Sequence, residues 1–430
     1  MKPLFPLVGK EAKLLRRAMT RWGLKVLGSE LVHRPDNMLA TLRRFKRLRR
    51  AGKIIEDGSK IMQFGADGNN TCVKMAVYVP HWLSTAVETR VRRALRSDTM
   101  WHEQVTLSIT DRCPYKCRHC SNARGRSKPM PQSRLVEVVR EIQDIGGSWL
   151  NIGGGEPGVV FERALAAVAA ADNRSETWLN TTGFDLDDEK ARRFKEAGLF
   201  GGRVSIHSHK AVEHDAFVGY HGAFKIAAEA IQTFRRADIF PVLSAAMPEE
   251  RITWHGVHDM MQLGKDLGAG FVEIIPIRPA GRAIVACSHS ELRRHDVNRQ
   301  MFETFNTDPR FADCPAVNSP AYLETPDRFG CVAGSERLYI SASGDVQPCP
   351  LVNLSLGNVL DESLASICQR MRSLLSGPRC NLLCSQLGPL VSEYVAEGGQ
   401  GCAVLPIPPA KSAEILADLP ASPTPKAWVL

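Results

Sequence analysis

The central part of the chain alternates between short β-rich runs and longer amphipathic segments. Six runs favour strands, at 104–110, 149–153, 177–182, 202–207, 241–246 and 271–277. Between them, apolar residues recur with helical spacing at 133–145, 161–171, 187–197, 221–236 and 253–267. This alternation indicates right-handed βαβ units and a parallel sheet. The pattern therefore predicts an α/β fold, a partial TIM-like (β/α)6 barrel rather than a closed eight-stranded one.

The regions on either side of the barrel have different patterns. Residues 1–100 predict a basic, mostly helical N-terminal module, with helices over 8–29, 38–54 and 84–97 and a strand over 71–79. The barrel then covers 101–310. After it, cysteine, glycine and proline become denser, which predicts a small metal-supported module over 311–402. Residues 403–430 hold six prolines and predict a mobile tail.

Composition places the chain among ordinary globular proteins. Hydrophobic residues make up 44% of it and charged residues 23%, which excludes wholesale disorder. No stretch reaches the roughly 18 uncharged apolar residues of a membrane-spanning helix. Charged residues interrupt any apolar run near the N-terminus that could act as a signal peptide. We therefore expect a cytoplasmic protein.

The positive charge is concentrated at the N-terminus. The formal net charge is +9, while residues 1–60 alone carry 16 Lys and Arg against 5 Asp and Glu. Basic amphipathic helices bind membrane surfaces, acidic partners or nucleic acid. We expect peripheral contact with an anionic membrane through residues 1–60. The alternative is a helical module packed on the barrel or capping its mouth.

The cysteines point to metal chemistry. The chain has twelve, and without a signal peptide metal ligation or redox chemistry is favoured over disulfides. Cys113, Cys117 and Cys120 follow the first predicted strand with the spacing C-x3-C-x2-C. Three thiolates on one loop suit three irons of a four-iron cluster and leave the fourth open to another ligand. A closed zinc site would need His119, whose position between two ligands would strain the loop.

This loop resembles that of the radical S-adenosylmethionine (SAM) enzymes, and further motifs over 104–390 carry the same resemblance. Residues 153–157 read Gly-Gly-Gly-Glu-Pro, like the family's Gly-Gly-Glu-Pro. Residues 181–183 read Thr-Thr-Gly, where Thr182 departs from the family's Asn, and in residues 204–208 His207 replaces an Asp. Residues 275–282 end like the family's Pro…Gly-Arg turn. Each motif falls at the C-terminal end of a predicted strand, where barrel chemistry sits.

The resemblance implies a set of catalytic and cofactor-binding residues. Cys113, Cys117 and Cys120 would hold a SAM-binding 4Fe–4S cluster and would be catalytic. SAM itself would be bound by Gly154, Gly155, Glu156, Thr181 and Ser205. Because Glu156 would contact the methionine ammonium, we expect it to matter for cofactor affinity more than for stability. Arg278 and Arg282 are candidates for a substrate carboxylate or the nucleoside.

A second cysteine set begins at Cys331 with the spacing Cys-x12-Gly-x4-Cys, which ends at Cys349. It resembles the opening of the SPASM and twitch modules, which bind auxiliary four-iron clusters. The few cysteines that follow cannot complete two clusters. The resemblance therefore implies one auxiliary 4Fe–4S cluster, with the ligands Cys331, Cys349, Cys380 and Cys384. Cys402 or Cys314 could displace one of the last pair, and four thiolates would also suit zinc.

The resemblance implies a radical SAM enzyme of the oxidoreductase or transferase type. Such an enzyme cleaves SAM reductively to a 5′-deoxyadenosyl radical, which removes hydrogen from an unactivated substrate carbon. The auxiliary cluster would make the reaction oxidative, and a flavodoxin- or ferredoxin-like protein would donate electrons. The basic N-terminus favours a lipid-like or membrane-held substrate, and the alternative is a peptide maturase. A third hypothesis is a non-catalytic Fe–S or zinc protein that binds nucleic acid, which the SAM motif series argues against.

Overall fold

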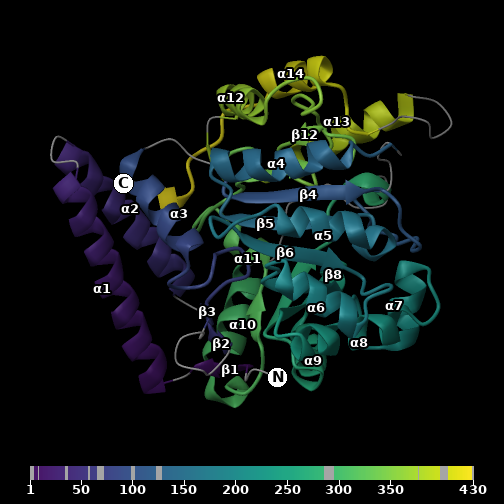
Figure 1. Ribbon diagram of the computed structural model, residues 1–430, viewed down its shortest axis with the longest axis horizontal. Coiled ribbons are helices and arrows are strands. Elements are labelled where there is room, and N and C mark those ends of the chain that lie inside the picture. The colour runs from purple at the N-terminus through teal and green to yellow at the C-terminus, as the bar shows by residue number, and fades with distance from the viewer. Residues whose placement is uncertain are drawn as a thin grey trace.

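A parallel sheet forms the centre of the molecule (Figure 1). The computed structural model describes residues 4–7, 9–33, 37–56, 59–64, 72–97, 102–122, 128–284, 295–375, 377–397 and 405–428. The parallel strands that follow one another along the chain are β4 (Gln104–Thr110), β5 (Trp149–Gly154), β6 (Glu176–Thr181), β7 (Gly201–Ser205), β8 (Phe240–Met247), β9 (Phe271–Pro276) and β10 (Ala316–Asn318). On the other side of β4, β11 (Arg337–Ile340) pairs in parallel and β12 (Val346–Gln347) pairs antiparallel with β11. The nine-stranded sheet therefore runs β10-β9-β8-β7-β6-β5-β4-β11-β12.

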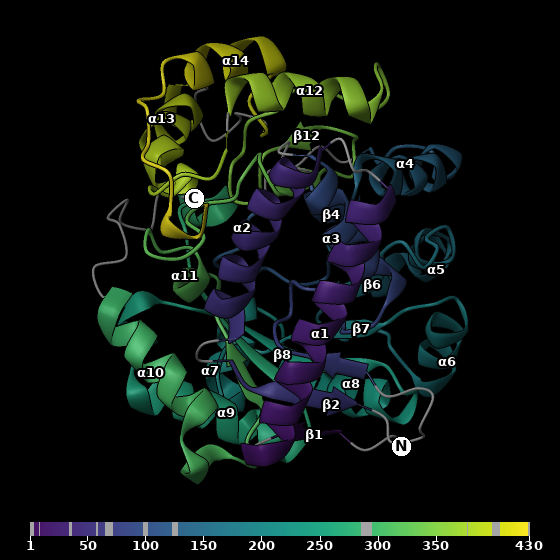
Figure 2. The same cartoon turned by 90° about the vertical axis from the view of Figure 1, so that its left-hand side faces the viewer.

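Helices cover the outer face of this sheet (Figures 1 and 2). They are α4 (Gln132–Ile145), α5 (Phe161–Ala169), α6 (Asp188–Glu196), α7 (Ala211–Val218), α8 (Ala223–Arg236), α9 (Trp254–Leu267) and α10 (His295–Thr307). Side chains fix several of their starts: Asp187 accepts a hydrogen bond from the Lys190 amide, and Thr253 accepts one from the Gly256 amide. The apolar stripes of these helices pack on the strands and form the main core.

The predicted α/β fold with a parallel sheet and a helical N-terminus is confirmed. The six predicted strands and five predicted helices of the barrel all form, within a few residues of the expected bounds. Helix α7 and strands β10, β11 and β12 were not predicted. Two of these strands have three residues or fewer, too short to show an alternating pattern.

The N-terminal region closes one end of the barrel. It consists of β1 (Leu4–Leu7), α1 (Gly9–His33), α2 (Met38–Glu56), β2 (Ile61–Phe64), β3 (Cys72–Lys74) and α3 (Thr85–Arg96). Met62, Phe64 and Val77 pack in one apolar cluster with aromatic residues near the starts of the barrel strands, namely Trp149, Trp178, Phe240 and Phe271. Figure 2 shows α1 and α2 crossing in front of the barrel. The region therefore packs on the barrel, as one of the alternatives expected, but it does so near the starts of the strands and not at the mouth.

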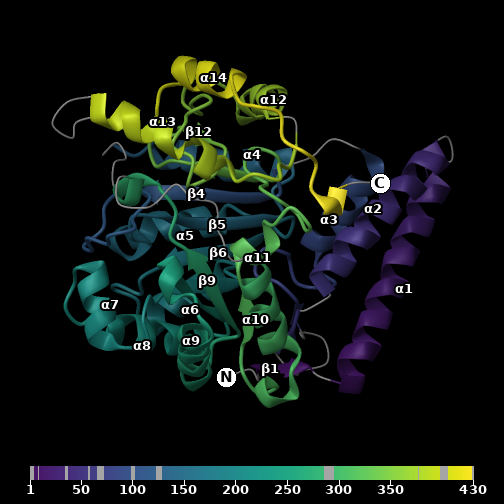
Figure 3. The same cartoon turned by 180° about the vertical axis from the view of Figure 1, so that it is seen from behind.

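The second cysteine set lies in a layer over one side of the barrel (Figure 3). This layer contains α12 (Leu364–Leu374), α13 (Leu383–Glu397) and α14 (Pro409–Ala417), whereas α11 (Pro320–Leu323) packs on α10 and β9. The described residues 405–428 differ from the predicted mobile tail, because Ile407 and Ala427 are fully buried. Proline prevents long regular elements there, but the apolar residues between the prolines still pack.

No helix in the described ranges is both long and apolar enough to cross a membrane.

A buried ion pair ties the N-terminal region to the barrel. Lys74 Nζ lies 2.5 Å from Glu176 Oε1, and the two side chains are 0% and 1% exposed. Replacing Lys74 with Met leaves a buried carboxylate without its main cation. We expect Lys74→Met to lower the free energy of unfolding by about 3–5 kcal/mol, measured by urea denaturation. The control, Glu189→Gln at the exposed Arg192–Glu189 pair, should leave the midpoint unchanged. An equal shift of the denaturation midpoint in both variants would contradict the burial of the Lys74–Glu176 pair.

Candidate active site

The loop that holds Cys113, Cys117 and Cys120 follows β4 directly and has no regular secondary structure. Burial raises the pKa of the Cys113 thiol to about 11 and that of Cys117 to about 12, and Cys120 adds to both shifts through its charge. The amide of Cys120 also donates to the carbonyl oxygen of Cys117 at 3.4 Å, so a turn of the loop brings these two residues together. Iron bound there would reverse this shift, because a coordinating thiol loses its proton.

Three later segments of the barrel hold this loop through backbone hydrogen bonds. After β5, the amide of Gly155 donates to Thr110 O (2.6 Å) and the amide of Glu156 donates to Arg112 O (2.8 Å). At the end of α7, carbonyls accept from two loop amides, Lys116 N to Val218 O (2.8 Å) and Arg118 N to Phe217 O (3.2 Å). After β9, the amide of Arg282 donates to Cys120 O (2.9 Å) and its side chain donates to Cys117 O (2.5 Å).

Glycine is required where the β5 segment meets the loop. A Cβ on Gly155 would lie 2.2 Å from Arg112 O, and one on Gly154, whose φ is +123°, would lie 2.3 Å from Ser108 Oγ. Both positions exclude any side chain. Gly281 meets the loop from the other side, where a Cβ would lie 2.3 Å from Cys120 O. The backbone can therefore approach the cysteine loop closely from both sides.

Glu156 is fully buried, and both oxygens of its carboxylate accept hydrogen bonds from within the chain. Oε1 accepts from Gly158 N (2.9 Å) and Thr181 Oγ1 (2.6 Å), and Oε2 accepts from the amide and the hydroxyl of Thr182 (2.7 Å each). Burial raises the pKa of Glu156, and these bonds oppose the shift. The carboxylate therefore ties the end of β5 to the end of β6, and Thr181 uses its hydroxyl in the same network.

Histidines pack beside the cysteine loop as neutral aromatic rings. His119 stacks on Phe217 with ring centroids 5.0 Å apart, and burial lowers its pKa to about 4. His207 Nδ1 accepts from the Ala246 amide at 3.0 Å, and burial lowers its pKa well below the usual range. His209 faces Asp259 instead, at 3.6 Å. The two strand-end histidines therefore do not converge on a metal.

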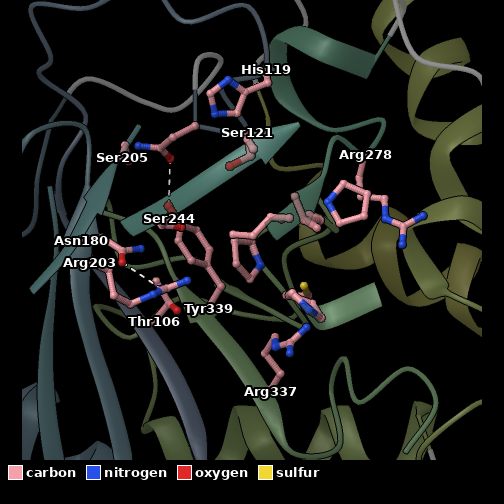
Figure 4. A pocket seen from close by; sticks show the side chains of 18 of the residues that line it. Thr106, His119, Ser121, Asn180, Arg203, Ser205, Ser244, Arg278, Arg337 and Tyr339 are labelled. Atoms are coloured by element: carbon pink, nitrogen blue, oxygen red, sulfur yellow. Dashed lines mark hydrogen bonds between the residues drawn. The ribbon is translucent and has the colours of Figure 1, made fainter. Parts of the chain in front are cut away.

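A cavity of about 290 Å³ lies inside the barrel (Figure 4), and its lining runs from Gln104 and Trp149 at the starts of their strands to Gly154 and His207 at the C-terminal ends of the strands. At one end it is lined by His119, Ser121 and Gly154, beside the first cysteine loop. At another end the cavity is lined by Glu324, which follows α11, and by Cys349 of the second cysteine set. Ser205, Arg278 and the backbone after β9 complete much of its wall. One cavity therefore reaches both cysteine sets.

The floor of the cavity is a buried charge network that the sequence analysis missed. Arg203 forms an ion pair with Glu273 and donates to Asn180 Oδ1 at 2.9 Å. Ser244 Oγ donates to the same Glu273 carboxylate at 2.9 Å, and Tyr78 of the N-terminal region also donates to it. The sequence does hold an indication of this network, because Arg203 and Glu273 are charged residues inside otherwise apolar strands.

The structure brings together part of the second cysteine set. Cys331 accepts a hydrogen bond at Sγ from the Leu383 amide (3.4 Å), and Cys384 is the next residue of the same helix. The charges of Cys331 and Cys349 add to the rise that burial causes in the pKa of Cys384. Burial also raises the pKa of Cys380, whose amide donates to Ser422 Oγ (3.0 Å) and to Pro423 O (3.2 Å). Cys314 lies at the closed end of the barrel, where its carbonyl accepts from Lys60 Nζ (3.0 Å). Cys402 lies outside the described residues.

The donor sets suit iron–sulfur clusters. In the first set Cys113 is exposed and Cys117 and Cys120 are half-buried, beside glycine backbone that leaves room for a ligand. The second set offers the buried thiols of Cys331, Cys349 and Cys384. Among the described residues, no three side chains of His, Cys, Asp or Glu are placed to hold a single metal ion. A four-iron cluster is wider than one ion, since its ligands bind different irons.

Two parts of the chain match known protein families. Residues 107–263 match the radical SAM superfamily, and residues 331–386 match the SPASM iron–sulfur cluster-binding domain. The chain therefore carries a radical SAM domain followed by a SPASM domain. Its radical SAM domain binds a 4Fe–4S cluster and SAM, and its SPASM domain binds auxiliary Fe–S clusters. The expected family, enzyme class and cofactors are confirmed.

Curated relatives and a solved structure resemble this radical SAM protein. An AdoMet-dependent heme synthase of Nitratidesulfovibrio vulgaris is 26% identical over 296 residues, covering 62% of this chain and 78% of the relative. A PqqA peptide cyclase of Bradyrhizobium diazoefficiens is 28% identical over 183 residues, covering 42% and 48%. The crystal structure of Streptococcus suis SuiB bound to precursor peptide SuiA shares the fold, with a TM-score of 0.52, 12% identity and coverage of 71% and 72%.

The Glu156 network changes the expected effect of its removal. Glu156→Ala would leave four donors without their acceptor. Each unsatisfied buried group costs about 1–3 kcal/mol, so we expect a clear loss of thermal stability in this radical SAM protein together with weaker SAM binding. The two effects are measured by calorimetry and by equilibrium dialysis. Weaker SAM binding at unchanged stability would show instead that Glu156 acts on the cofactor directly.

The close approach of Gly155 to the cysteine loop gives a second prediction. Gly155→Ala places a methyl group against Arg112 O and displaces the loop. We expect anaerobically reconstituted Gly155→Ala to retain about half of its iron, as the first cluster is lost and the second remains. Gly28→Ala, with nothing within 4 Å of the new Cβ, is the control and should keep all of it. Full iron content in both variants would contradict the close contact between Gly155 and the cysteine loop.

Proposed function

We propose that the enzyme uses SAM to remove hydrogen from a substrate carbon inside the barrel cavity, in a net oxidative reaction. The observation that carries this proposal is one cavity that is lined by His119 and Ser121 of the first cysteine loop and by Cys349 of the second set. When bound and reduced, the first cluster supplies the electron that cleaves SAM and generates a 5′-deoxyadenosyl radical. A substrate in this cavity would lie within reach of SAM at one end and of the auxiliary cluster at the other.

The chain's own residues position the cofactor and exclude water. We assign Cys113, Cys117 and Cys120 to the first cluster, and Gly154 and Gly155 to the backbone that approaches SAM. Ser205 lines the cavity beside them and is a candidate contact for SAM. Glu156 and Thr181 support this backbone from behind. The N-terminal region seals the opposite end of the barrel, which protects a radical from solvent.

The cavity floor supports a polar substrate group. The ion pair between Arg203 and Glu273 and the side chains of Asn180 and Ser244 offer hydrogen bonds rather than an apolar surface. Arg278 lines the same cavity, is 8% exposed and forms no ion pair with the described residues, so it suits a substrate carboxylate. We propose a peptide substrate. The PqqA peptide cyclase relative supports this, and so does the SuiB fold with its bound peptide.

The outer side of the first cysteine loop suits an electron donor. Arg112, Lys116 and Arg118 are exposed around the loop. A basic face of this kind complements the acidic surface of a flavodoxin- or ferredoxin-like protein. We therefore assign the donor to this face.

The proposal predicts the iron content and the cleavage product. Anaerobically reconstituted protein should hold close to eight irons, about four per cluster. The triple variant Cys113→Ala, Cys117→Ala and Cys120→Ala should keep about half of that iron and form no 5′-deoxyadenosine from SAM and dithionite, measured by chromatography. Stoichiometric zinc without iron uptake would overturn the proposed cluster chemistry.

A second candidate is a lipid-like or membrane-held substrate, and one observation favours it. The outer faces of α1 and α2 expose several large apolar side chains beside their Lys and Arg residues, namely Leu14, Leu24, Val32, Met38 and Leu39. Between α1, α2 and α3 lies a largely apolar cavity of about 700 Å³. Mixed apolar and basic surfaces of this kind bind anionic membranes.

Vesicle binding tests the membrane contact. Deleting residues 1–60 would also remove β1, which pairs with β2, and Lys60, whose Nζ donates to Phe311 O, so substitutions are the sharper tool. If the contact exists, the protein co-sediments with anionic vesicles, is released at high salt, and binds more weakly after Leu24→Glu with Leu39→Glu. The control is Val212→Glu at another exposed apolar residue. Equal binding by both variants would remove this candidate.

A further inference from the structure

A second cavity, of about 700 Å³, lies between the three helices of the N-terminal region, α1, α2 and α3 (Figure 2). At one end of this group the helices pack closely, and Val26, Leu27 and Leu95 are buried together. Toward the start of α1 and the end of α2, the cavity takes the place of such a core. Its volume lies within the range of about 300–1,000 Å³ that is usual for small-molecule sites.

The walls of this cavity are mostly apolar. Trp22, Phe45, Leu48 and Trp82 line it and are only half-buried. The main-chain groups of α1 and α2 are paired within their helices, so the walls offer few hydrogen bonds. A hydrocarbon chain needs none, whereas an extended peptide would leave N–H and C=O groups unpaired there. The walls therefore suit a hydrocarbon chain better than a peptide backbone.

Two glycines inside the helices leave room in the cavity. Gly23 of α1 and Gly52 of α2 both line it, and neither has a φ in the left-handed region. A Cβ on Gly52 would meet no described atom within 4 Å, and one on Gly23 would meet only Phe45 Cε2, at 3.9 Å. Glycine destabilises a helix interior relative to alanine. Packing within the chain requires neither glycine, but both widen the cavity.

The charged side chains at this cavity are mainly cations. The described residues that line it include Arg49, Arg50, Lys53 and Arg90 but one acidic residue, Glu56. Arg49 and Lys53 lie one turn apart on α2, are exposed, and form no hydrogen bond or ion pair with the described residues. Two cations at the edge of an apolar cavity complement an anionic head group.

This cavity is separate from the one inside the barrel. No described residue lines both cavities. Val73 and Met75 line the cavity between the helices, while Lys74 between them reaches Glu176 at the closed end of the barrel. Successive residues of an extended chain point to opposite faces, so this segment forms a wall between the helices and the barrel. A ligand bound between the helices is therefore not the substrate of the radical step.

We propose that the cavity between α1, α2 and α3 binds a single acyl chain with an anionic head group. The chain lies among the apolar walls, and the head group lies beside Arg49 and Lys53. An α-helix with its side chains is about 10 Å wide and rises about 5.4 Å per turn, so the cavity would hold fewer than two turns of a helical peptide. The inference goes beyond the proposed function, because the ligand binds away from the barrel cavity.

Equilibrium dialysis of the anaerobically reconstituted, full-length protein against radiolabelled dodecanoate tests this site. The dodecanoate is kept below its micelle concentration, so that it is monomeric. We expect one molecule per chain, and much weaker binding of dodecyltrimethylammonium, which has the same chain length with a cationic head group. Bromododecanoate should quench tryptophan fluorescence more than dodecanoate does, because bromine quenches on contact. Trp22→Phe with Trp82→Phe should remove this difference.

A cavity-filling variant tests the position of the chain. Gly52→Leu places a side chain into the open space of the cavity and favours the helix. We expect it to weaken dodecanoate binding roughly tenfold or more. The matched control is Gly28→Leu, at an exposed glycine of α1 that does not line this cavity, and it should leave binding unchanged.

A charge variant tests the position of the head group. Arg49→Ala with Lys53→Ala should weaken dodecanoate binding roughly threefold to tenfold and leave the binding of dodecanol unchanged. Arg43→Ala with Lys46→Ala removes the same charge from exposed positions of α2 that do not line the cavity, and it should change neither. Circular dichroism of each variant checks that it is folded.

Equal dodecanoate binding by Gly52→Leu and Gly28→Leu would overturn the proposed site. Quenching that persists in Trp22→Phe with Trp82→Phe would do the same, because the ligand would then lie elsewhere. Binding of the protein to anionic vesicles without any binding of monomeric dodecanoate would also overturn it, in favour of contact with a membrane surface. The proposed radical chemistry would stand in each case, since iron content and 5′-deoxyadenosine formation test it separately.

Discussion

The cysteine loop after β4 has no regular structure, so the rest of the site depends on the backbone hydrogen bonds that hold it. Those bonds come from the segments after β5 and β9 and from the last residues of α7. Each segment must approach closely, and two of them do so at glycines, Gly155 and Gly281, where a side chain would collide with the loop. Motifs far apart in sequence are therefore parts of one support for three thiols.

The N-terminal region also helps to form the cavity. It seals the closed end of the barrel with an apolar cluster and sends Tyr78 to the carboxylate of Glu273 on the cavity floor. Charges enclosed in this way act in a low-dielectric setting, where they orient a polar substrate more strongly than at a surface. This explains why an element that lies before every cofactor motif still shapes the cavity.

Much of the fold was predictable because the barrel strands and helices follow strict periodicities. The first cysteine set could also be singled out from the sequence, since Cys113, Cys117 and Cys120 are close together along one loop. The charge network at the floor of the cavity was harder to predict. Arg203 and Glu273 lie 70 residues apart in the sequence, and they meet only once the chain has folded. Glu156 shows a different limit, because its residue type suggested a cofactor contact, whereas its four internal hydrogen bonds became visible only in three dimensions.

The central claim is that both cysteine sets serve one cavity. Anomalous diffraction at the iron edge from anaerobic crystals of the reconstituted enzyme with SAM tests it most directly. The account predicts two iron positions, one beside the Cys113–Cys120 loop and one beside Cys349, with the cavity between them. Iron at only one of these positions, or iron bound on the outside of the barrel, would contradict it.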